Sequence, residues 1–153
     1  MSHDLVPDFL LTSSDGKRIR PSDYRGVSNL VLVFADHPDD ERCMLFLAGL
    51  AQHYNDFVQE DAEILTVIRG SVQQAERVKR NYHFPFLVLA DADGQACRAV
   101  GAVASNGQCA LTVYIADRYN EVYSVYQTGD GDGLPTLKEM LDRLRFIQIQ
   151  CPE

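Results

Sequence analysis

The four cysteines, at positions 43, 97, 109 and 151, are the residues of this chain with the most distinctive chemistry. An ionised cysteine can attack an electrophilic oxygen or sulfur atom. No two of the four form a C-x-x-C pair, which argues against dithiol exchange chemistry and against a structural zinc site. Because the start of the chain lacks the pattern of an export signal, we expect reduced thiols rather than disulfides, with Cys97 and Cys109 serving as packing residues.

Cys43 is the candidate nucleophile. Apolar side chains recur at helical spacing over residues 42–58, which predicts the longest helix of the chain, with Asp39 or Asp40 as its N-cap. Cys43 then falls in the first helical turn, where the helix N-terminus and Arg42 favour a thiolate. We expect it to be the most accessible of the structured thiols.

An acidic segment surrounds this predicted helix start. Its carboxylates, which disfavour a thiolate, are Asp36, Asp39, Asp40 and Glu41. The opposing effects are roughly balanced, so no strongly lowered pKa is expected, and an ordinary half-buried cysteine remains an alternative interpretation of Cys43. With His37 the segment offers metal-ligand types, but ligands so close in sequence seldom converge on one ion. We predict a solvated acidic loop, with no metal and no cofactor.

Alternating strand and helix patterns predict an α/β fold in which these thiols are placed. The runs 30–35 and 64–68 are unbroken and apolar, so we expect adjacent, parallel, central strands. Further strands are predicted as a hairpin over 6–20, at 86–89, and as an antiparallel pair at 111–115 and 121–126; helices are predicted at 71–82, 95–100 and 134–147. This order indicates a three-layer sandwich with a mixed central sheet, and residues 1–153 as one domain.

The charge of the chain limits its partners. The formal net charge is −8 and the pI is near 4.9, so a polyphosphate surface would repel the protein and nucleic acid is not an expected partner. No apolar run approaches the ~18 residues of a membrane span, and the start of the chain lacks the pattern of a secretory signal. We predict no membrane association and a cytoplasmic location.

Several short segments, in a shared order, resemble the alkyl hydroperoxide reductase and thiol-specific antioxidant (AhpC/TSA) group of peroxiredoxins. They are Val6-Pro7-Asp8-Phe9, Asp15-Gly16-Lys17, Ser22-Asp23-Tyr24-Arg25-Gly26, Phe84-Pro85-Phe86 and Asp91-Ala92-Asp93-Gly94. The resemblance implies a thioredoxin-like fold and places Cys43 where the family carries its peroxide-reacting cysteine. It also makes Cys151, followed by Pro152, similar to the family's resolving cysteine.

The chain departs from the family at two points. The family's loop has Pro seven positions before the cysteine and a Thr between them, whereas Pro38 lies five positions before Cys43 and no Thr intervenes. Cys109-Ala110 stands where the family has an arginine. The resemblance therefore implies a weak or specialised thiol antioxidant that acts on peroxide or thiol substrates, with a homodimer as an open possibility. The alternative is a catalytically degenerate module for redox sensing or protein interaction.

Overall fold

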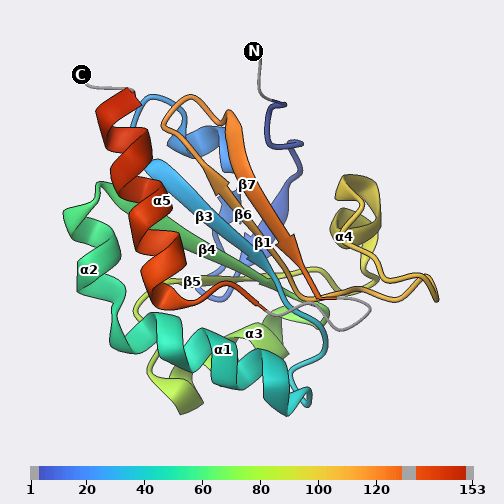
Figure 1. Cartoon of the computed structure of the whole chain (residues 1–153). Helices are drawn as coiled ribbons and strands as arrows, with labels where there is room; N and C mark the ends of the chain where they lie inside the picture. The colour runs from blue at the N-terminus through green and yellow to red at the C-terminus, as the bar shows by residue number, and fades with distance from the viewer. Residues whose placement is uncertain (1–3, 129–133, 151–153) are drawn as a thin grey trace.

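The computed structural model describes residues 4–128 and 134–150, which form a seven-stranded sheet and five α-helices (Figure 1). The strands are β1 (Leu11–Ser13), β2 (Arg18–Ile19), β3 (Asn29–Phe34), β4 (Ala62–Ile68), β5 (Leu87–Ala90), β6 (Thr112–Ala116) and β7 (Val122–Gln127). Their order across the sheet is β2-β1-β5-β4-β3-β6-β7. The sheet is mixed, as the alternation of strand and helix patterns predicted.

β3 and β4 form the centre of the sheet. They are parallel, with Val31 opposite Ile64, and every residue of β3 is buried. An unbroken apolar run fits this place because both faces of a central strand are covered. The prediction of two adjacent, parallel, central strands is confirmed.

Antiparallel strands lie toward both edges of the sheet, with β5 parallel to β4 between β1 and the centre. The predicted N-terminal hairpin is present as β1 and β2, and β1 begins at Leu11 instead of Val6. On the other side β6 pairs with both β3 and β7. The β6–β7 turn uses Asn120 at φ 65°, the left-handed conformation that asparagine tolerates.

Helices cover the two faces of the sheet unequally. They are α1 (Glu41–Gln52), α2 (Tyr54–Gln59), α3 (Val72–Tyr82), α4 (Gln95–Val100) and α5 (Leu137–Gln150), with a short 3-10 helix η1 (Pro21–Tyr24). α1, α2, α3 and α5 bury their apolar side chains in one core cluster on one face. α4, which stands apart from these helices in Figure 1, packs with the N-terminal segment on the opposite face. The predicted three-layer arrangement is confirmed.

The predicted longest helix is interrupted. α1 ends at Gln52 and α2 begins at Tyr54, because His53 leaves the helical conformation at φ −114° and ψ 21°. The 14-residue α5 is therefore longer than the 12-residue α1, and the prediction of one longest helix over 42–58 is wrong. Within the described ranges, no helix has both the length and the apolar character needed to cross a bilayer.

Candidate functional site

Cys43 is the third residue of α1, in the first turn as predicted. Asp40 is the N-cap, and its Oδ1 accepts hydrogen bonds from the backbone N–H groups of Arg42 at 3.1 Å and of Cys43 at 3.3 Å. A capping carboxylate satisfies donors that the helix cannot satisfy itself. The loop after β3 thus fixes where α1 begins, and with it the position of the thiol.

The Cys43 thiol points into the core. The residue is only 2 % exposed and belongs to the same core cluster as Leu47 and Leu50, which follow it at helical spacing. Its Sγ accepts a hydrogen bond from the backbone N–H of Asp36, with 3.5 Å between nitrogen and sulfur. The expectation that Cys43 is the most accessible of the structured cysteines is therefore wrong, since Cys109 is 8 % exposed and the side chain of Cys43 turns toward the sheet.

Burial raises the pKa of Cys43 from 9.0 to about 11. The N–H of Asp36 acts in the opposite direction, while the negative charges of Asp40 and Asp36 add to the increase. The balance expected from the sequence does not hold, because desolvation outweighs the single hydrogen bond. Cys43 is accordingly a neutral thiol at neutral pH.

Arg69, a residue that the sequence analysis missed, connects to the Cys43 loop. It directly follows β4, and its Nε donates a hydrogen bond to Asp36 Oδ1 at 2.7 Å. Because β3 and β4 are parallel neighbours, the residues that follow them meet at one edge of the sheet. That adjacency is the sequence signal that points to Arg69.

A disulfide joins Cys97 and Cys109, with their Cα atoms 6.0 Å apart. The expectation that both residues are reduced packing thiols is wrong. The chain between them folds back on itself, since Val103 pairs with Cys109 and the N–H of Ala110 bonds the carbonyl of Ala102 at 2.9 Å. This return brings Cys109, three residues before β6, against α4 and within bonding distance of Cys97.

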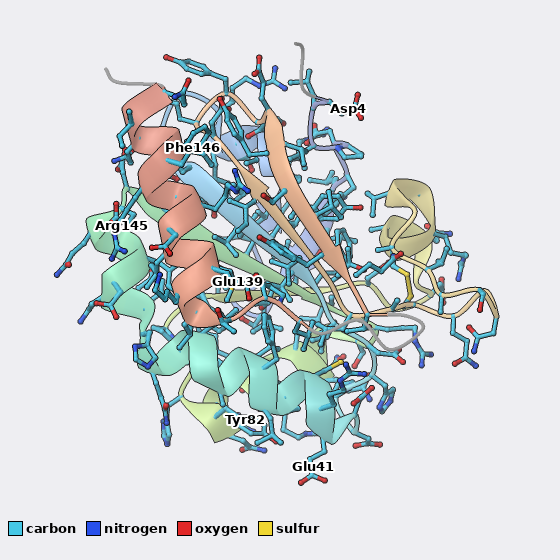
Figure 2. All side chains as sticks on the ribbon, viewed as in Figure 1. Asp4, Glu41, Tyr82, Glu139, Arg145 and Phe146 are labelled. Carbon is cyan, nitrogen blue, oxygen red and sulfur yellow. A yellow bond between two sulfur atoms is a disulfide. The ribbon has the colours of Figure 1, made fainter. Side chains whose placement is uncertain are left out.

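The disulfide and Cys43 lie on opposite faces of the sheet. Cys97 and Cys109 belong to the core cluster of the α4 face, and Cys43 belongs to the cluster of the α1 face. Figure 2 shows the disulfide beside α4, away from the start of α1 where Glu41 is labelled. The sheet therefore separates the two sulfur sites. Cys151, the predicted resolving thiol, lies outside the described residues.

The acidic loop before α1 uses its polar side chains locally. His37 Nδ1 accepts the backbone N–H of Asp39 at 3.1 Å, and Asp40 caps the helix. Within residues 4–128 and 134–150, no group of three or more His, Cys, Asp or Glu side chains gathers as a metal ion would require. Asp36 is engaged with Arg69, so the loop is an ion-paired and capped segment.

A mixed sheet with a free cysteine at the start of the first long helix is the arrangement of a thioredoxin-fold thiol protein. The family model described as "AhpC/TSA family" matches residues 3–125. The chain belongs to the AhpC/TSA family, and it is peroxiredoxin-like, as its sequence motifs implied.

Sequence identity to an individual relative is low. "Peroxiredoxin bcp1" of Schizosaccharomyces pombe is 25 % identical over 104 residues, which are 68 % of this chain and 53 % of the relative. The chain thus spans about half the length of that relative.

Solved peroxiredoxin structures share the fold. Peroxidoxin BcpB from Mycobacterium tuberculosis superposes with a TM-score of 0.83 at 20 % identity, covering 95 % of this chain and 97 % of that one. Enterococcus faecalis AhpC superposes with a TM-score of 0.82 at 18 % identity, covering 97 % of this chain and 94 % of that one. At these identities the similarity establishes the architecture alone.

Proposed function

We propose that the chain is a slow thiol-dependent peroxidase whose nucleophile is Cys43. The observation that carries the proposal is the placement of this thiol: the first turn of α1, directly after the central strand β3, with Sγ held by the N–H of Asp36. Membership of the AhpC/TSA family supports the same role. Asp36 and Arg69 position the site from the ends of two neighbouring strands.

The proposed reaction is a two-electron transfer at sulfur. The Cys43 thiolate attacks one oxygen of a hydroperoxide, the O–O bond breaks, and the leaving oxygen takes up a proton to give water or an alcohol. Cys43 becomes a sulfenic acid. A second thiol then attacks this sulfur, releases water and forms a disulfide, and a further thiol returns Cys43 to its reduced state.

The raised pKa makes this enzyme slow. At pH 7 a thiol with a pKa of about 11 is ionised in roughly 1 molecule in 10⁴. A cysteine with an ordinary pKa is ionised in a few per cent of molecules or fewer. Burial adds a second barrier, because peroxide reaches Sγ only when the first turn of α1 opens.

An external small thiol is the proposed reductant, and Cys151 is the proposed internal alternative as a resolving thiol. A homodimer, a cytoplasmic location and a single domain over residues 1–153 remain predictions. With either reductant, the external thiol or Cys151, the chemistry at Cys43 is the same and only the source of the second sulfur differs.

A redox-sensing role is the second candidate. The same two observations favour it, namely the burial of Cys43 and its raised pKa, because both reduce the rate of each turnover and leave single oxidation events possible. Turnover number distinguishes the candidates: a sensor is oxidised once by each exposure to peroxide and stays oxidised until it is reduced, whereas a peroxidase cycles continuously.

Consumption of hydrogen peroxide with excess small thiol tests the proposal. We expect slow, sustained consumption by the unchanged protein and by Cys151→Ser, and none by Cys43→Ser. Trapping with dimedone followed by peptide mapping should find the sulfenic acid at Cys43. Unaltered consumption by Cys43→Ser would refute the role of Cys43, and oxidation without turnover would assign the chain to the sensing class.

A further inference from the structure

A cavity of about 270 Å³ opens beside the Cys97–Cys109 disulfide. Its lining residues are Arg69, Ala92, Asp93, Arg98, Gly107, Gln108 and Cys109. Arg98 and Cys109 both approach Gly94: a methyl group added to this glycine would lie 3.1 Å from Arg98 Nη1 and 3.3 Å from Cys109 Sγ. One sulfur of the disulfide and a guanidinium group therefore border the same small space.

The two sulfurs differ in their access to this cavity. Cys109 lines it and is 8 % exposed, whereas Cys97 is 2 % exposed and does not line it. Cys97 sits inside α4, where its backbone N–H bonds Asp91 Oδ2 at 3.0 Å. A small molecule in the cavity thus meets Cys109 first.

The charges around the cavity favour a ligand that carries a carboxylate. Arg69 is already paired with Asp36, but within the described ranges no carboxylate pairs with the exposed guanidinium of Arg98. Asp93 on the rim carries the opposite charge, which suits an amino group. An amino-acid-derived molecule offers both charges, and its carboxylate would give Arg98 the partner it lacks.

We propose that the cavity is a thiol–disulfide exchange site, in which a small carboxylate-bearing thiol docks on Arg98 and attacks Cys109. The ligand class follows from the unpaired cation, and the attacked atom follows from the sulfur that lines the cavity. The disulfide belongs to the core cluster on the opposite face of the sheet from Cys43, while the cavity shares Arg69 with the Cys43 loop. The inference does not rest on the proposed peroxidase.

The exchange balances without any further reagent. The incoming thiolate attacks Cys109 Sγ, the Cys97–Cys109 bond breaks, and Cys97 leaves as a thiolate that takes up a proton. The thiolate of a second small thiol then attacks the small-thiol sulfur of the mixed disulfide, and its bond to Cys109 breaks. Cys109 leaves as a thiolate that takes up a proton, and the two small thiols are released as one disulfide. Two small thiols are therefore oxidised and one protein disulfide is reduced. The carbonyl oxygen of Ala102, 3.3 Å from Cys97 Sγ, is placed to accept a hydrogen bond from the released thiol.

The test compares three small thiols on the Cys43→Ser/Cys151→Ser variant of the whole chain. In this variant Cys97 and Cys109 are the only remaining cysteines. The probes are 3-mercaptopropionate, neutral 2-mercaptoethanol and cationic cysteamine. Each rate of disulfide reduction is divided by the rate for the same protein in urea, which removes intrinsic differences among the thiols. We expect this ratio to be about threefold to tenfold higher for 3-mercaptopropionate than for 2-mercaptoethanol, and lowest for cysteamine.

Two arginine variants separate docking from general charge. Arg98→Gln should abolish the preference for 3-mercaptopropionate, whereas Arg80→Gln, which removes an exposed arginine paired with Glu76 on α3, should keep it. Peptide mapping should place the first mixed disulfide on Cys109. Absence of the disulfide from purified protein, equal ratios for the three probes, loss of the preference in both variants, or a first adduct on Cys97 would each overturn the proposal.

Discussion

One carboxylate oxygen of Asp40 lies 3.3 Å from the backbone nitrogen of Cys43 and 3.1 Å from that of Arg42. These N–H groups belong to the helix start that would otherwise stabilise a thiolate at Cys43. The N-cap therefore occupies them with a negative charge. The same contact that begins α1 works against ionisation of its cysteine.

Replacing this charge should activate the thiol. Asn caps a helix as well as Asp does, so Asp40→Asn should retain the fold while it lowers the pKa of Cys43. We expect alkylation of Cys43 at pH 7.5 to accelerate about threefold to tenfold, measured by iodoacetamide labelling and mass spectrometry. Asp39→Asn is the matched control, because the Asp39 side chain is 93 % exposed and lies in the same loop. Equal acceleration in both variants would contradict the role of Asp40.

Stability should fall between pH 9 and pH 11. Below pH 9 the Cys43 thiol is neutral in both the folded and the unfolded chain, and its full contribution is present. Above that the unfolded chain ionises first, because the folded pKa is raised to about 11, and the free energy of unfolding declines by about 2 kcal/mol across the window. Urea unfolding at several pH values measures this decline.

Cys43→Ala supplies the control for that decline. Tyr54 also has a raised pKa, to about 12, because burial and its hydrogen bond to Glu63 favour the neutral phenol. Ionisation of Tyr54 at high pH therefore lowers the free energy of unfolding of both the unchanged protein and Cys43→Ala. The difference between the two pH profiles therefore isolates the cysteine, and parallel profiles would show that Cys43 ionises normally.

Arg69 should support the reactivity of Cys43 from a distance. It pairs with Asp36, whose negative charge raises the pKa of Cys43. Arg69→Gln leaves that charge uncompensated, so we expect about twofold to fivefold slower peroxide oxidation of Cys43 and a pH profile shifted upward. Arg80→Gln should leave the rate unchanged. A rate that falls with no shift of the pH profile would point to a purely structural effect.

The disulfide should stabilise the fold. It closes a loop with a sequence separation of 12, for which chain-entropy arguments give about 3 kcal/mol. We expect Cys97→Ser/Cys109→Ser to unfold at correspondingly lower urea concentration. Dithiothreitol should destabilise the unchanged protein to a similar extent and leave the double variant unaffected.

The central architecture was predictable because it depends on local apolar runs. Residues 30–35 and 64–68 are continuous β-forming segments, and burial on both faces is the arrangement that suits them. The start of α1 was predictable for a similar reason, since Asp40 is a strong N-cap residue next to a helical pattern.

The state of each cysteine was less predictable because it depends on tertiary geometry. Leu45 is one of the apolar residues in the predicted helix over 42–58, yet it is 67 % exposed, whereas Cys43 is buried. Helical spacing alone therefore did not identify which side of α1 faces the core. The Cys97–Cys109 bond depends on a chain reversal over residues 101–110 that only the folded neighbours specify. Arg69 was missed because its partner, Asp36, is 33 residues away.

The disulfide has a topological consequence for a cut chain. Residues 105–108 form an exposed turn between Cys97 and Cys109, and proteolytic nicking there would divide the chain after β5 and α4 but before β6. Because the S–S bond spans the cut, the fragments would stay covalently joined and migrate as one species until a reductant is added. β6 would also remain hydrogen-bonded to β3 in the antiparallel ladder, so the nicked molecule would behave as a two-chain protein.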